Sequence, residues 1–315
     1  MGSFIARRLL AMVPLLFIIT FAVYALVLLV PGDPARTLAG GLHADPAEIV
    51  RIRHQLHLDQ PLLAQYWRWL THALRGDLGQ SLFQHESVAH GIATRLPLTL
   101  SLAIGGFAVS ILIGLPLGIL AGTRPGTAVD RSATTASSAG IAMPDFWVAI
   151  ILVVAFAVKL HWLPDIGYVK LSTSPLQWAK HLLLPWIALG LGGGATLARQ
   201  VRGSLIDALD QDYVRTARAM GIAERRVVWQ LALKNALTPA MTILGIQFAY
   251  LLGGTVIIEQ IFSIPGLGEY ILSAIDSKDL PIVQGVVLLT AVVFVVVNLF
   301  VDIMYGVLNP KVRVS

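Results

Sequence analysis

The sequence predicts an all-α polytopic membrane protein with six transmembrane helices and a cytoplasmic pair of helices between the fourth and the fifth. The first observation is composition: 56% of the 315 residues are hydrophobic, 13% are charged, and the mean hydropathy is +0.74. A soluble domain of this length is less apolar. The second is a series of apolar runs, at residues 9–30, 97–121, 133–158, 181–198, 237–258 and 282–308.

The first apolar run follows Arg7 and Arg8, as the apolar part of a signal peptide would. It is longer than the roughly 7–15 residues typical of such a segment, and residues 31–34 then read Pro-Gly-Asp-Pro. We therefore expect an uncleaved first span with its N-terminus in the cytoplasm.

The polar stretch at residues 31–96 is expected outside the cell, with helical pieces at 47–58 and 61–74. It holds six of the eight histidines: His43, His54, His57, His72, His85 and His90. His54 and His57 have the spacing that lets two imidazoles share a helix face, but spacing places no third ligand. We expect surface histidines and no metal site, with a nickel relay as the alternative. The chain has no cysteine, so disulfides and thiolate sites are excluded.

Glycines and one proline distinguish the next three spans. Those of the second span predict close helix packing: Gly105, Gly106, Gly114 and Gly118. The third span is interrupted by Pro144 and Asp145, which indicates either a kinked, cavity-lining position or a break between two helices at the interface. Gly190 and Gly192–Gly194 in the fourth span are not followed by Lys-Ser/Thr, so they do not predict a phosphate-binding loop.

Residues 204–239 are polar and face water, because their basic residues are too costly in a bilayer. These are Arg215, Arg218, Arg225, Arg226 and Lys234. Leu205, Leu209, Tyr213 and Ala217 recur every fourth residue and predict one surface helix. Its N-terminal part carries Asp207, Asp210 and Asp212, Gly221 closes it, and a second amphipathic helix contains Val227, Val228 and Leu231. The alternative is an ordinary basic loop.

Residues 259–268 separate the fifth and sixth spans. Pro265 and Gly266 predict a turn, and the amphipathic stretch through Ile275 either dips back toward the pathway or belongs to a plain external turn. Asn298 and Asp302, near the end of the sixth span, are expected to point inward or to lie at the cytoplasmic interface.

The distribution of basic residues sets the expected orientation. The proposed inner segments carry thirteen Lys and Arg, and the much longer outer segments carry ten. This favours both termini in the cytoplasm. The expected organisation is residues 1–94 as the first span and external loop, 95–304 as the main transmembrane domain including 204–239, and 305–315 as a cytoplasmic tail.

Three segments resemble a known family. DYVRTARAMG at 212–221 resembles the cytoplasmic coupling loop of permease subunits of ATP-binding-cassette importers, and LALKNAL at 231–237 is similar to the dipeptide, oligopeptide and nickel branch. EQIFSIPGLG at 259–268 resembles a signature of peptide-type permeases, and the external LDQPL and GDLGQS segments fit the same branch. Arg215-Thr216-Ala217 replaces the general Glu-Ala-Ala, and residues 231–234 replace Ile-x-Leu-Pro. Both departures are usual in the peptide branch.

The resemblance implies a permease subunit of a binding-protein-dependent importer in a bacterial or archaeal inner membrane. It implies a second homologous permease subunit, two ABC ATPase subunits that bind ATP and Mg, and an extracytoplasmic substrate-binding protein. Alternating access would carry the solute. We expect di- or oligopeptides, with nickel or another small solute left open, and neither a cofactor nor catalysis on this chain.

The resemblance also assigns candidate residues. The expected contacts with the ATPase are Asp212, Tyr213, Val214, Thr216, Ala217, Arg218, Ala219 and Gly221. For the pathway or its gate, the interruption of the third span gives Pro144 and Asp145, and the segment that resembles the signature gives Phe262, Ser263, Pro265, Gly266 and Gly268.

Other classes of protein fit the sequence less well. The net charge of +5 is spread among loops without interleaved aromatics, so nucleic-acid binding is not expected. An ion-coupled secondary carrier needs charged residues within its spans, and the polar candidates there are Asp145, Asn298 and Asp302. A membrane enzyme needs a constellation of nucleophile, base or metal ligands, which the sequence does not contain.

Overall fold

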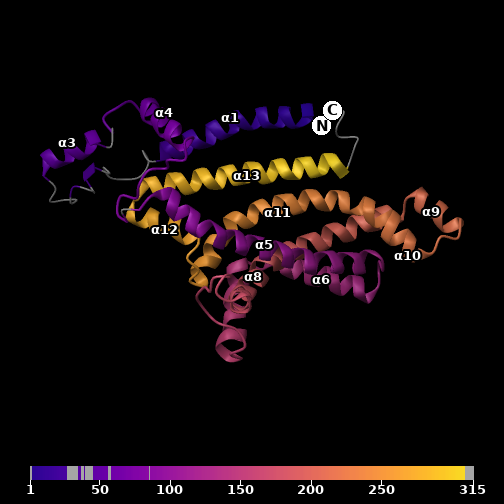
Figure 1. Ribbon diagram of the computed structural model, residues 1–315. Helices are drawn as coiled ribbons and strands as arrows, with labels where there is room; N and C mark the ends of the chain where they lie inside the picture. Colours follow the sequence, from indigo (N-terminus) through magenta and orange to yellow (C-terminus); the bar gives the residue numbers. More distant parts are fainter. Residues whose placement is uncertain are drawn as a thin grey trace. The chain divides into compact units, whose positions relative to one another are not determined.

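A computed structural model describes residues 2–26, 35–36, 39, 45–55, 58–84 and 86–308 (Figure 1). Every regular element within these residues is helical, and the only β pairing among them is an isolated bridge between Gln80 and Ser87. The prediction of an all-α protein is confirmed.

The chain forms two compact units. Unit 1 consists of Leu98–Gly268 and the described residues from Val296 onward, and unit 2 consists of Gly2–Pro97 and Glu269–Val295. The division falls within α5 (Val88–Gly122), α12 (Leu267–Ser277) and α13 (Leu280–Leu308).

Unit 1 is built around α8 (Pro175–Leu209), against which α6 (Ala128–Ala142), α7 (Asp145–Leu152) and α11 (Leu233–Ile261) pack (Figure 1). Ser174 caps α8, accepting a hydrogen bond from the backbone N–H of Gln177, and Pro175 begins the helix, where its missing N–H costs nothing. Apolar side chains from α5, α7, α8 and α11 form one core.

Glycines let the backbones of α5 and α8 approach closely. A Cβ atom on Gly190 would collide with the carbonyl oxygen of Gly106, and one on Gly114 would collide with the carbonyl oxygen of Gly194. Small residues at such a crossing are typical of helix packing in lipid. The predicted packing role of these glycines is confirmed.

Four described helical segments are long and apolar enough to cross a bilayer: Val88–Gly122, Pro175–Leu209, Glu224–Ile261 and Leu280–Phe300. A bent pair of helices supplies a fifth if it counts as one span. In α1 (Gly2–Leu26) the apolar helix Met12–Ala25 is shorter, and residues 27–30 of the predicted first span lie outside the described residues. A multi-spanning protein is confirmed, and the count of six spans stays a prediction.

The third apolar run does not form one helix. α6 ends at Ala142, α7 begins at Asp145, and the two directions differ by 101°. Pro144 lies between them with extended backbone (φ −65°, ψ 139°), and it lacks the N–H that would continue the hydrogen bonding of α6. The interruption expected within 133–158 is thus a break between two sharply angled helices, of which the second continues as the π-helix η3 (Val153–Lys159).

The predicted surface helix of 204–220 is also divided. α8 continues through Leu209, so Leu205, Leu209 and Asp207 belong to α8, and Asp210 caps its C-terminal end. Gln211 is extended (φ −72°, ψ 151°), and a new helix, α9 (Asp212–Ala219), follows. Placing all three acidic residues at one N-terminus was wrong: only Asp212 lies in the first turn of α9.

The second predicted surface helix is continuous with the fifth span. α10 (Glu224–Arg226) leads into the π-helix η4 (Val227–Ala232) and then into α11. The helical segment that contains the fifth span therefore starts at Glu224, before the predicted residue 237. Apolar residues of η4 are buried against α8, which keeps the chain helical where the sequence is still polar.

In unit 2, α4 (Leu62–Ala73) packs on α1 through aromatic rings, and α3 (Pro46–Gln55) precedes it. Tyr66 is buried, lies 5.2 Å from Phe21 and 5.5 Å from Phe17 between ring centroids, and its hydroxyl is 2.9 Å from that of Thr20. The helical pieces predicted at 47–58 and 61–74 are confirmed over their described parts. Residues 56 and 57 lie outside them.

Candidate functional site

The first candidate site is the exposed surface of α9 and the turn that follows it (Figure 1). Val214 and Ala217 are buried, and with Val227 of η4 they form a small apolar cluster. Tyr213 is 40% exposed, and its hydroxyl accepts a hydrogen bond of 3.1 Å from Asn235. The buried stripe of this helix is thus Val214 and Ala217, and the prediction that placed Tyr213 in it was wrong.

Ion pairs connect α9 to the C-terminal end of α8 and to α10. Arg215 lies 3.0 Å from Asp210 and 3.6 Å from Asp212, and Arg218 donates two hydrogen bonds, of 2.6 and 3.1 Å, to Glu224 of α10. The hydrogen bonds with Glu224 raise the pKa of Arg218 above its ordinary value. Exposed pairs each contribute only about 0–1 kcal/mol. Their main effect here is to hold the side chains in place.

Gly221 ends α9 in a left-handed conformation, with φ +73°. The N–H of Gly221 donates to the carbonyl of Arg218, and the N–H of Ile222 donates to the carbonyl of Ala217, at 3.0 and 3.1 Å. These two bonds define the Schellman motif, in which glycine is preferred. Ile222 packs on the cluster of Val214 and Ala217, as the motif requires. The predicted helix end at Gly221 is confirmed.

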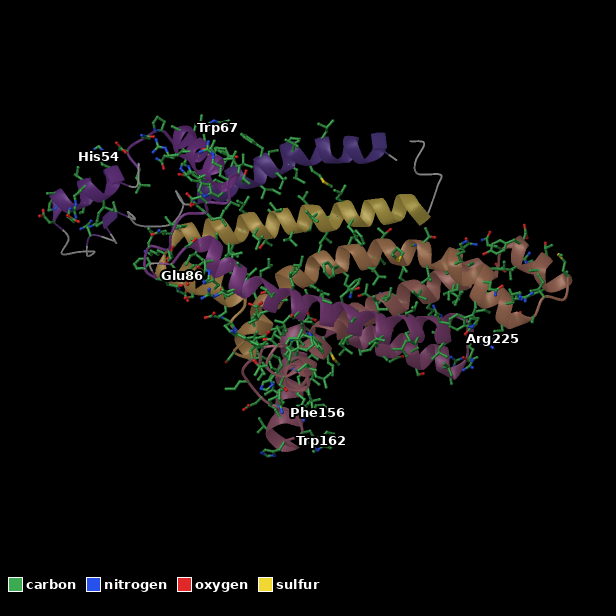
Figure 2. All side chains as sticks on the ribbon, in the orientation of Figure 1. His54, Trp67, Glu86, Phe156, Trp162 and Arg225 are labelled. Atoms are coloured by element: carbon green, nitrogen blue, oxygen red, sulfur yellow. The ribbon has the colours of Figure 1, made fainter. Side chains whose placement is uncertain are left out.

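The predicted ATPase contacts divide into two groups. Val214 and Ala217 are buried beneath α9 and support it from below. The others are exposed: Asp212, Tyr213, Thr216, Arg218, Ala219 and Gly221. Met220 is 73% exposed, and Arg225 of α10, labelled in Figure 2, is exposed as well. We call Asp212–Gly221 with Arg225 the α9 surface.

The second candidate site is a cavity of about 600 Å³ in unit 1. It lies where the break between α6 and α7 faces α8 and α11. Its described lining residues are Ile141, Ala142, Met143, Pro144, Asp145, Leu189, Gly192, Gly193, Thr196, Ile243, Ile246, Gln247, Tyr250 and Leu251. Two predicted pathway residues, Pro144 and Asp145, therefore lie at this cavity.

Adjacent glycines of α8 make room for polar groups at the cavity wall. One oxygen of Asp145 lies 3.4 Å from the position that a Cβ atom on Gly192 would take, and the amide of Gln247 occupies the space of a Cβ on Gly193. Gln247 donates a hydrogen bond of 3.2 Å to the hydroxyl of Ser110. These two glycines, which the sequence excludes from a phosphate-binding loop, thus shape the cavity.

The other predicted pathway residues lie apart from the cavity, in the turn between α11 and α12. Phe262, Ser263, Pro265, Gly266 and Gly268 are not among its described lining residues. Phe262 is buried, and its carbonyl accepts a hydrogen bond of 2.8 Å from Gly167. The turn predicted at Pro265 and Gly266 is present, since the helix breaks there and α12 begins at Leu267.

A buried acid, Glu259, organises this turn, and the sequence analysis did not single it out. Glu259 is 0% exposed and accepts hydrogen bonds from the Thr99 hydroxyl at 2.6 Å and from the Gly268 N–H at 2.7 Å. The Thr99 hydroxyl in turn accepts from the N–H of Leu267 at 2.9 Å. A Cβ on Gly266 would collide with the Glu259 carboxylate. The available signal was one acidic residue closing an apolar run before Pro-Gly.

A second buried acid, Asp130, joins α6 to α8. It is 3% exposed and pairs with Arg202, with a hydrogen bond of 2.9 Å from Nη2 to Oδ2, and it accepts another of 2.9 Å from the N–H of Gly126. In the sequence, Asp130 stands only in the short polar segment between the apolar runs at 97–121 and 133–158. No local pattern links Asp130 to a residue 72 positions later.

The described histidines form no metal site. His54 lies 2.9 Å from Asp59 on an exposed surface, and Nδ1 of His72 lies 2.8 Å from the carbonyl of Arg68 (Figure 2). Among the described residues no group of three or more metal-binding side chains occurs. The other half of the predicted pair, His57, lies outside the described residues, as do His43 and His85.

Comparison with solved structures shows the fold. The chain superimposes on a chain of the inward-facing MetNI methionine ABC transporter with a TM-score of 0.55, covering 69% of this chain and 96% of that one. The sequences are 19% identical.

Comparison of sequences covers the whole chain. A peptide transport system permease protein of Brucella abortus (strain 2308) and the glutathione transport system permease protein GsiC of Salmonella paratyphi A are each 40% identical over 313 residues, which is 99% of either chain. Residues 1–103 match the N-terminal family of binding-protein-dependent transport system membrane components, and residues 114–314 match the inner membrane component itself. The chain belongs to the family of inner membrane components of binding-protein-dependent transport systems.

Proposed function

We propose that this chain is a permease subunit of an ABC importer and forms part of the translocation pathway for di- or oligopeptides. The observation that carries this is identity of 40% along the full length with relatives named for peptide and for glutathione, itself a tripeptide. By the same proposal, ATP and Mg are bound and ATP is hydrolysed on partner subunits. This chain supplies the path and the mechanical link.

The α9 surface is the proposed docking site for an ATPase subunit. It is exposed, it is capped at Gly221, and Val214 and Ala217 anchor it to η4, which is continuous with α11. A displacement of α9 by the ATPase would therefore move α11, which lines the cavity. The complete importer has two ATPase subunits, a second homologous permease subunit and an extracytoplasmic substrate-binding protein. Lipid covers the apolar faces of the spans.

Orientation follows from this docking. The α9 surface must face the cytoplasm to meet an ATPase. If α1 and the bent pair each count as one span, six spans place both termini on that same side. The break at Pro144 and Asp145 is the proposed lining of the pathway, and the turn of Phe262, Ser263, Pro265, Gly266 and Gly268 is proposed to hold the end of α11 during its movement.

Uptake in cells tests the substrate. A strain lacking this chain is compared with and without its restoration on a plasmid, using labelled dipeptide, labelled longer peptide and nickel. Restored peptide uptake that resists an uncoupler and fails on ATP depletion is the expected result. Nickel uptake alone would move the assignment to a metal importer, and ATP-independent uptake would indicate a secondary carrier.

Replacement of Gly221 tests the docking surface. Gly221→Glu adds a bulky acidic side chain in the left-handed region at the exposed turn, so we expect peptide uptake to be abolished while the protein still accumulates in the membrane. Gly203→Ala serves as the control, because a Cβ there meets nothing within 4 Å. Unchanged uptake by Gly221→Glu would contradict this docking site.

A further inference from the structure

The cavity in unit 1 has one charged group. Of its described lining residues only Asp145 is charged, and most of the others are apolar or glycine. Asp145 is half-buried in the first turn of α7, and none of the described residues donates a hydrogen bond to its carboxylate or forms an ion pair with it. A carboxylate at membrane depth is costly and normally finds a partner. Asp145 therefore reaches the cavity with no partner among the described residues, and its carboxylate is available to a cation that enters the cavity.

A second acceptor without a partner belongs to the same wall. The Oε1 atom of Gln247 is buried and accepts no hydrogen bond from the described residues. Its orientation is set by Ser110, whose hydroxyl lies 2.9 Å from the carbonyl of Gly190 and 3.0 Å from that of Gly106. The Ser110 proton goes to a carbonyl, so its oxygen can only accept from Gln247. The NH₂ group of Gln247 therefore points toward Ser110, and the carbonyl oxygen of Gln247 has no hydrogen-bond donor among the described residues.

Both side chains pack on α8, where Oδ1 of Asp145 approaches Gly192 and the amide nitrogen of Gln247 approaches Gly193. Around them the wall is apolar, with Ile243, Ile246 and Leu189. The Asp145 carboxylate in this wall repels anions and offers no donor to a neutral acceptor. It suits a cation that carries several N–H donors, and a primary ammonium has three. A metal ion would require more ligands than this wall supplies.

We propose that this cavity binds the primary ammonium group of the transported solute, with Asp145 as its ion-pair partner. The Gln247 oxygen is buried, and it would add a second acceptor on a rotation of the side chain that exposes it to the cavity. The proposal rests on the proposed function, which sends short peptides along this path, and it identifies the end of the peptide that the permease recognises. The apolar wall accommodates the neighbouring side chain of the peptide.

Single-cysteine labelling tests this directly, because the natural chain contains no cysteine. Thr196 lines the cavity and is exposed, so Thr196→Cys gives this chain one reporter thiol there. Membranes containing the whole importer, depleted of ATP, are treated with a maleimide in the presence of trialanine, N-acetyl-trialanine or an N-acetyl tripeptide with one lysine. We expect trialanine to slow labelling of this chain, and N-acetyl-trialanine to have no effect. The N-acetyl lysine peptide carries an ammonium only on its side chain. If it slows labelling, the cavity also accepts a side-chain ammonium, which supports ammonium binding; if it does not, the cavity is selective for the amino terminus.

Charge removal completes the test. In the Thr196→Cys background, Asp145→Asn should weaken protection by trialanine roughly ten-fold, the factor that about 1.4 kcal/mol produces. Asp145→Glu should retain much of it. The matched control is Asp165→Asn, which removes a carboxylate from an exposed loop and should leave protection unchanged.

Two results would overturn the inference: equal protection by trialanine and N-acetyl-trialanine, or protection that is unaffected by Asp145→Asn. Absence of protection by any peptide, in membranes from cells that take up trialanine through this chain, would also overturn it and would leave the proposed function standing. Absence of peptide uptake through this chain would instead contradict the proposed function. The two failures are therefore distinguishable.

Discussion

Two acidic residues in apolar surroundings of unit 1, Glu259 and Asp145, have opposite environments. Glu259 is fully buried, and its carboxylate accepts hydrogen bonds from Thr99 and Gly268. Asp145 lines a cavity, and no described residue pairs with it. The first acid holds a turn together, whereas the second is available to a ligand. Burial and hydrogen-bond partners, rather than residue type, distinguish the structural acid from the functional candidate.

The largest effect on stability is expected from Glu259→Ala. It leaves two buried donors, the Thr99 hydroxyl and the Gly268 N–H, without their acceptor, at about 1–3 kcal/mol each. The melting temperature of the purified importer should fall clearly and peptide uptake should be lost. Glu259→Gln keeps one acceptor and should lose less. If Glu259→Ala melted at the same temperature as the wild type, Glu259 would not be the structural acid described here.

Gly268→Ala should have an intermediate effect. The new Cβ would collide with the backbone of Val256 and approach the Glu259 carboxylate, and overpacking of this kind costs about 1–3 kcal/mol. Thermal unfolding of the purified importer measures it. The control is Gly253→Ala, in α11, where a Cβ meets nothing within 4 Å. If both variants melt alike, the turn is not packed on Glu259 as described.

A smaller loss is expected from Gly221→Ala. A side chain at φ +73° costs about 1–2 kcal/mol, although the Cβ itself has free space. Because the strain falls on the end of α9, it should appear as faster proteolysis within 212–226 in membrane vesicles, with little change in the melting temperature. Proteolysis at the wild-type rate would show that the left-handed turn does not limit the order of α9.

The smallest effect on stability is expected from Asp145→Asn. No hydrogen bond or ion pair with a described residue is lost, so the melting temperature should stay within the range of ordinary surface changes, about 0.5 kcal/mol, or rise. Peptide uptake should nevertheless fall. A large drop in melting temperature would mean that Asp145, like Glu259, is a structural acid.

Much of the fold was predictable from local patterns. The apolar runs predicted most of the long helices, the glycines of α5 and α8 predicted close packing, and Gly221 predicted the end of α9. The divided surface helix was not predictable from the period of four, because Leu205 and Tyr213 fall on the same pattern whether or not the backbone breaks at Gln211. Periodicity reports which side chains align in an unbroken helix and does not detect a break.

The candidate sites also combine residues that local sequence patterns reveal with residues that they do not. Pro144 and Asp145 were singled out from the sequence as exceptions in an apolar run, and both line the cavity. The five pathway candidates of the turn come from the resemblance of residues 259–268 and lie apart from the cavity, and their assignment to a gate stays a prediction. Glu259 and Asp130 were missed because their partners, Thr99 and Arg202, are 160 and 72 positions away.

The sequence by itself determined the class of the protein, since apolar segments of spanning length and polar loops follow from composition, and backbone preferences of proline and glycine are local. It also placed the exposed basic segment around α9. Only the tertiary structure decided the angle of 101° at Pro144, the burial of Val214 in place of Tyr213, and which of the acids Glu259 and Asp145 has partners. These depend on which distant side chains share a space, and hydrogen bonding and packing between such side chains leave no periodic trace along the chain.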